Sequence, residues 1–121
     1  MARAVRGALT VAGRPPSGIG FMIRDVLAEG GELHVYEIAR RVNQLRAQVG
    51  VKAAAPEYVK RLIYTARNVG LVNFVGQEKK PMDEQHAGYD ILNYRRFYGL
   101  TPGSENSAVW KDLPRIQADK T

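Results

Sequence analysis

The chain has no cysteine and only two histidines among its 121 residues. Without cysteine there is no disulfide bond, no thiol nucleophile and no thiolate metal ligand, which fits a reducing compartment. Neither His34 nor His86 stands at metal-ligand spacing from another ligand type. No apolar run approaches the roughly 20 residues needed to cross a bilayer. We therefore expect no metal, no cofactor and no membrane partner, and a cytoplasmic or nucleoid-associated protein.

A readable set of catalytic residues is also missing. Asp83 and Glu84 are adjacent carboxylates in a polar segment, and Ser104 and Ser107 lie in a turn-rich segment. No motif positions a general base beside any of them. We therefore expect a protein that is not an enzyme.

Positive charge is what the sequence has in excess. The formal net charge is +6 and the pI about 9.8, which favours a polyanionic partner such as nucleic acid, although a solvated basic surface has the same composition. Hydrophobic residues make up 45 % of the chain, enough for one domain with a single core.

The most clearly marked element is residues 56–69, where apolar residues recur every three or four positions and predict a helix. Proline at position 56 suits its first turn, and Gly70 suits its end. Its predicted buried residues are Val59, Leu62, Ile63, Ala66 and Val69. Its predicted outward residues are Glu57, Lys60, Arg61, Tyr64 and Asn68, with Thr65 and Arg67 at the flanks of this face.

The helix passes directly into residues 71–75, a short apolar run that predicts a strand. A helix that ends in Arg-Asn-Val-Gly-Leu-Val and continues as a strand resembles the recognition helix and first wing strand of winged helix-turn-helix domains. The resemblance covers roughly residues 18–100. It implies an α+β fold of three helices and a two- to three-stranded antiparallel sheet that forms one long wing.

The remaining elements follow from spacing and from helix-end signals. A first helix is expected from a Ser17 cap to Gly30 and Gly31, and a short strand over 32–35. A second helix over 36–49 is expected to bury Ile38, Val42, Leu45 and Val49. The returning wing strand is expected over 93–100. Residues 1–17 are expected to be a flexible basic arm and residues 101–121 a C-terminal tail.

The resemblance implies sequence-specific binding of double-stranded DNA by a small transcriptional regulator, as a homodimer. Helix 56–69 would enter the major groove, where Lys60 or Arg61 pairs with guanine and Asn68 with adenine. The arm and the wing would add salt-sensitive contacts to phosphates. The residues expected there are Arg3, Arg6, Arg14, Arg40, Arg41, Lys52, Lys79, Lys80, Arg95 and Arg96.

Several alternatives stay open at this point. The same scaffold could hold a protein partner through its wing and tail, or bind RNA through aromatic residues such as Tyr94 and Phe97. Tyr64 could be a half-buried core residue, and each arginine could be solvated charge. Trp110 could fold back on its own domain as a clasp, or pack against a second copy.

Overall fold

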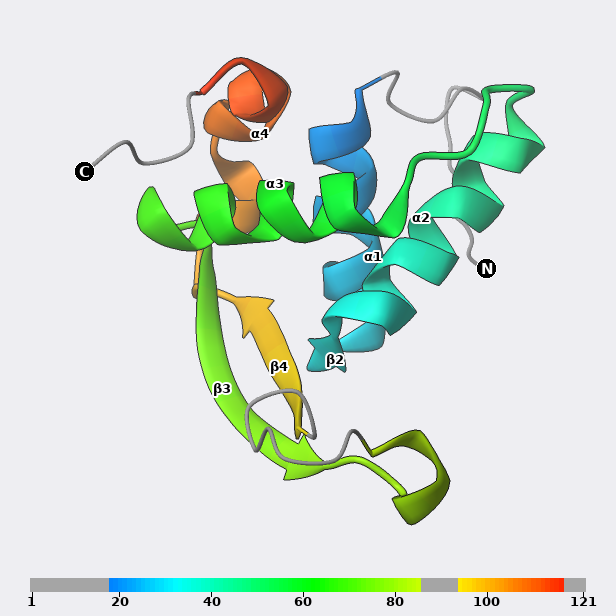
Figure 1. The fold of residues 1–121 in the computed structure, drawn as a ribbon. Helices are drawn as coiled ribbons and strands as arrows, with labels where there is room; N and C mark the ends of the chain where they lie inside the picture. Colours follow the sequence, from blue (N-terminus) through cyan, green and yellow to red (C-terminus); the bar gives the residue numbers. More distant parts are fainter. Residues whose placement is uncertain (1–17, 86–93, 117–121) are drawn as a thin grey trace.

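The computed structural model describes residues 18–85 and 94–116, and in these ranges it confirms the predicted α+β class (Figure 1). These ranges hold a three-stranded antiparallel sheet and four α-helices, one more than the three predicted, because the expected C-terminal tail contains α4. The elements follow the order α1 (Ile19–Gly30), β2 (Leu33–His34), α2 (Val35–Gln48), α3 (Pro56–Asn68), β3 (Val72–Lys79), β4 (Tyr94–Leu100) and α4 (Val109–Asp112). Single 3-10 turns are η1 (Met82–Glu84), η3 (Ser104–Asn106) and η4 (Leu113–Arg115). None of the helices in the described ranges has the length and apolar character to span a membrane.

The first two helices lie close to their predicted bounds, with different caps. Gly18, not the predicted Ser17, is the N-cap of α1, and Ser17 lies outside the described residues. α2 begins one residue early because His34 caps it: the Glu37 backbone N–H donates to His34 Nδ1 at 3.3 Å. Burial, and then the nearby Arg95 charge, lower the pKa of His34, which favours the neutral ring that this cap requires.

Two residues that were predicted to be buried are exposed, and for the same reason. Val49 and Val69 are 38 % and 43 % exposed, because each is the C-cap residue beyond the last turn of its helix. There the backbone leaves the helical path, so the three- and four-residue periodicity no longer points the side chain at the core.

The sheet has the strand order β2-β4-β3, so the long strand β3 forms one edge. β3 runs well beyond the predicted residues 71–75 and ends before Pro81, which lacks the N–H needed to continue it. Val72 pairs with Leu100, Phe74 with Tyr98, and Lys79 with Tyr94. A bulge between Phe74 and Gly76 shifts the register by one residue.

The core lies between the helices and the sheet, and the segment after β4 contributes to it. Trp110 is fully buried, and its Nε1 donates to the Ser104 carbonyl at 2.8 Å. Leu113 is also fully buried, and a Cβ on Gly20 of α1 would meet the Trp110 carbonyl oxygen at 1.9 Å. The interpretation that Trp110 folds back on its own domain is therefore confirmed, and α4 packs directly on α1.

Candidate nucleic-acid interface

α3 presents a polar face between two other parts of the molecule. In Figure 1 it crosses the middle of the view, with β3 and β4 below it and α4 above it. Val59, Leu62, Ile63 and Ala66 are buried beneath the helix. The residues that are exposed or half-buried on the other side are Glu57, Lys60, Arg61, Tyr64, Arg67 and Asn68.

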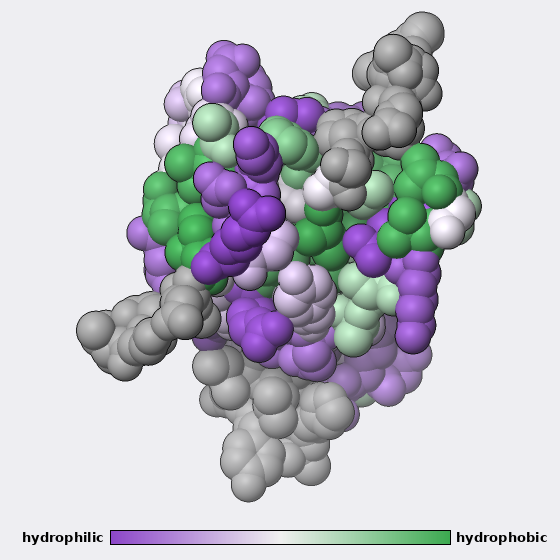
Figure 2. Space-filling model, turned by 90° about the horizontal axis from the view of Figure 1, so that it is seen from above, coloured by the Kyte–Doolittle hydropathy of each residue, from purple (hydrophilic) through white to green (hydrophobic). Residues whose placement is uncertain are grey.

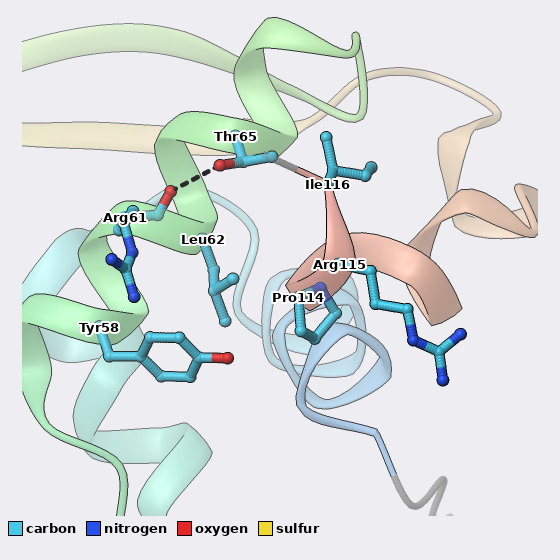
Figure 3. Close-up of a pocket in the computed structure, with 7 residues that line it drawn as sticks. All are labelled: Tyr58, Arg61, Leu62, Thr65, Pro114, Arg115 and Ile116. Carbon is cyan, nitrogen blue, oxygen red and sulfur yellow. Dashed lines mark hydrogen bonds between the residues drawn. The ribbon is translucent and has the colours of Figure 1, made fainter. Parts of the chain in front are cut away.

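Thr65 does not belong to this face, although it was expected at its flank and among the DNA-contacting residues. It is 3 % exposed, and its hydroxyl donates to the Arg61 carbonyl at 3.0 Å (Figure 3). At position 65 the helix surface turns from the outward face towards the C-terminal segment, and residues 114–116 lie against it. Its burial therefore depends on a segment about fifty residues later in the chain, which the spacing within α3 does not reveal.

The outward face of α3 continues onto the sheet through a set of aromatic contacts. The Tyr64 ring lies 6.3 Å from the Tyr98 ring, and the Lys60 ammonium lies 5.9 Å from the Tyr64 ring. The Tyr98 ring lies in turn 5.8 Å from the Phe74 ring of β3. Tyr64 is half-buried because of this packing. α3 and the start of the sheet are thus joined by one aromatic cluster, without a gap between them.

Strand register decides which cations of β3 and β4 share the α3 side of the sheet. Side chains alternate along β4, so Arg96 lies on the same face as Tyr98, and Arg95 on the opposite face. Arg95 pairs with the Glu84 carboxylate at 2.5 Å. The cross-strand partners of Arg96 and Tyr94 are Gln77 and Lys79, which therefore also lie on the α3 side.

We call this continuous face the α3–sheet surface. Its members are Glu57, Lys60, Arg61, Tyr64, Arg67, Asn68, Phe74, Gln77, Lys79, Tyr94 and Arg96. Five of them are cationic and one is a carboxylate, Glu57, whose Oε1 lies 3.9 Å from Lys60 Nζ. Burial, and then the neighbouring Tyr64, raise the pKa of Tyr98, whereas Arg96 and Arg67 act in the opposite direction and so lie near its hydroxyl.

The predicted phosphate contacts on α2 are arranged differently. Arg40 and Arg41 both bind Glu37, with Nε–oxygen distances of 3.0 and 2.6 Å, and these hydrogen bonds lower the pKa of Glu37 to about 2. Arg40 is one helical turn from Tyr36, whose hydroxyl donates to Glu57 of α3 at 3.4 Å. Arg40 is therefore on the side of α2 that meets the α3–sheet surface, with a charge already matched by Glu37.

The other predicted basic residues are scattered. Lys52 is exposed in the connection between α2 and α3, where its carbonyl accepts from Arg46 Nε at 2.7 Å. Lys80 is half-buried next to η1, and its carbonyl accepts from the Gln85 side chain at 2.9 Å. The arm residues Arg3, Arg6 and Arg14 lie outside the described residues.

Two residues of interest were missed by the sequence analysis. Phe74, predicted only as part of a strand, is 41 % exposed on the α3–sheet surface, and Arg115 is exposed beside α3. A signal for Phe74 was available, because successive side chains of a strand point to opposite faces and an aromatic residue has an even chance of facing outward. No sequence pattern pointed to Arg115, because its position beside α3 depends on how the C-terminal segment folds back.

Comparisons with protein-family models, with curated proteins and with solved structures give no match for this chain. Across residues 18–85 and 94–116, no three histidine, aspartate or glutamate side chains group together as metal ligands. The function is therefore inferred from the α3–sheet surface itself.

Proposed function

We propose that this chain is a winged helix-turn-helix protein that binds double-stranded DNA sequence-specifically, as a small transcriptional regulator. The observation that supports the proposal is the α3–sheet surface, on which five cations and one carboxylate follow a helix and the adjoining sheet face without interruption. DNA presents a regular array of phosphates on both sides of a groove, and a continuous basic surface of this shape matches it.

Dimensions support α3 as the element that enters the major groove. The helix has 13 residues, and its outward residues other than Tyr64 are not packed in the core. At roughly 3.3 Å per residue, the seven steps from Val72 to Lys79 carry β3 about 23 Å away from the end of α3. That length exceeds the roughly 12 Å width of the major groove, so Lys79 would reach phosphates beyond its edge.

The residues then divide into two roles. Lys60 and Arg61 would hydrogen-bond to guanine acceptors, and Asn68 to adenine, since these side chains have the matching donor and acceptor patterns. Arg67, Arg96 and Lys79 would neutralise phosphates and supply affinity without sequence preference. The packing of Tyr64 on Tyr98 would hold the middle of α3 in a fixed orientation relative to the wing.

The test is selection from a randomised duplex DNA pool at two salt concentrations, with a single-stranded RNA control. We expect an enriched motif, and an inverted repeat if the protein binds as a homodimer. The variant Lys60→Ala/Arg61→Ala should lose the motif, whereas Lys111→Ala, at an exposed residue of α4, should keep it. Preference for the RNA would instead favour the RNA-binding alternative. No binding to either nucleic acid at moderate salt would reject the proposal in favour of a protein-interaction module.

A further inference from the structure

A recess of about 300 Å³ lies between α3 and the C-terminal segment. Tyr58, Arg61, Leu62 and Thr65 of α3 form one wall, and Pro114, Arg115 and Ile116 form the other (Figure 3). Seen from above in Figure 2, this side of the molecule carries hydrophilic side chains directly beside apolar ones. The recess adjoins the outward face of α3 because Arg61 belongs to both.

The lining of the recess carries positive charge and exposes more polar than apolar surface, and its apolar part comes from side chains such as Tyr58 and Pro114. Tyr58 and Leu62 face Pro114 across the gap, and the lining residues include two guanidinium groups and no carboxylate. The Arg61 guanidinium carbon lies 5.2 Å from the Tyr58 ring, which holds this cation at the edge of the recess. Arg115 lies at the opposite rim, where its exposed side chain points away from the gap and Nη1 lies 3.5 Å from an Asp112 carboxylate oxygen (Figure 3).

We propose that this recess binds a small organic anion with an apolar ring. The ring would pack between Tyr58, Leu62 and Pro114, and the carboxylate would bind Arg61, with Arg115 turning in from the other rim. Carboxylates form strong, charge-assisted hydrogen bonds with guanidinium groups. The volume is at the lower end of the range for small-molecule sites, so a ligand of one or two rings fits.

A bound anion would also compete with DNA. The N–H groups of Arg61 cannot donate to a carboxylate and to a base or phosphate at the same time. A bound anion would therefore weaken DNA binding and act as an effector. This coupling rests on the proposed function. Binding of the anion itself does not, because both walls of the recess form without DNA.

The direct test is titration of the full chain with 2-naphthoate, followed by nuclear magnetic resonance and calorimetry, in the absence of DNA. The neutral isostere 2-naphthamide is the matched ligand control. We expect naphthoate to bind, Arg61→Ala to weaken it about tenfold and Arg115→Ala by about threefold, as for the loss of charge-assisted hydrogen bonds. Lys111→Ala, an exposed cation outside the recess, should bind as the wild type does.

Three results would overturn the recess as an anion site: no binding of naphthoate at millimolar concentration, equal binding of naphthamide, or unchanged affinity in Arg61→Ala. The effector role is tested separately, by adding naphthoate or naphthamide to a preformed complex with the selected DNA. Only naphthoate should release the DNA, and release by both or by neither would overturn the coupling. If the protein binds no DNA, the direct titration still decides whether the recess is a binding site.

Discussion

The Arg67 guanidinium carbon lies 6.0 Å from the centroid of the Phe74 ring, and this contact joins the last turn of α3 to the start of β3. Between them the chain turns at Gly70, whose φ of 87° is one that residues with a side chain rarely adopt. Leu71 follows directly and is buried, so the turn is anchored in the core. The helix and the long strand are therefore held at a fixed angle, which a surface needs if it is to read DNA with both.

The two adjacent arginines of β4 should differ in their effect on DNA binding. Arg96 lies on the α3–sheet surface, whereas Arg95 lies on the opposite face and pairs with Glu84. In Arg96→Ala we expect weaker binding and a slope of log affinity against log salt that is smaller by about 0.9, the value for one lost phosphate contact. Arg95→Ala is the matched control and should keep the wild-type slope. Equal slopes in both variants would contradict the assignment of the surface.

Substitutions at Thr65 and Asn68 should have separate effects, the first on the stability of the fold and the second on DNA recognition. Thr65→Val removes a buried hydroxyl that donates to the Arg61 carbonyl, so it should change stability by about 1 kcal/mol or less and leave DNA binding unchanged. Asn68→Ala should leave the melting temperature unchanged and relax the base preference at one position of the selected motif, at a cost of about 1–3 kcal/mol. Urea denaturation and binding to single-base variants of the motif measure the two effects. A loss of DNA affinity in Thr65→Val would show that its hydroxyl acts at the interface.

The sequence predicts α3 well because helix burial is a local property: the spacing of Val59, Leu62, Ile63 and Ala66 defines the buried side. Contacts between distant segments are not encoded by such spacing. That Arg96 rather than Arg95 faces α3 depends on the β3–β4 register and on a bulge, which no spacing within one strand reveals.

The burial of Thr65 and the recess beside it likewise depend on the position of residues 114–116. The His34 cap of α2 was not predicted either, because histidine rarely caps a helix and its role here depends on a neutral ring. All five cations of the α3–sheet surface are therefore among the residues that the sequence predicts for DNA contact, but the placement of Arg95 and Arg96 on opposite sheet faces is not predicted.

The segment after β4 should be necessary for folding. Trp110 is fully buried against α1, so Trp110→Ala should lower the free energy of unfolding by about 3–5 kcal/mol. Its neighbour Val109 is 37 % exposed, and Val109→Ala should cost about 1 kcal/mol or less. Urea denaturation followed by circular dichroism measures both. Similar midpoints for the two variants would show that the C-terminal segment is dispensable for the core.

Glu37 should make stability depend on pH in the acid range. Hydrogen bonds from Arg40 and then Arg41 lower its pKa from the ordinary 4.5 to about 2. Because the folded-state pKa is below the unfolded one, the stabilisation is fully present above about pH 4.5 and is lost as the pH falls towards 2. Denaturation midpoints between pH 6 and pH 2 should fall less steeply in Glu37→Gln than in the wild type. The double variant Arg40→Ala/Arg41→Ala should flatten the profile in the same way, because it removes the hydrogen bonds that shift the pKa. A wild-type slope in both variants would mean that other carboxylates cause the acid sensitivity.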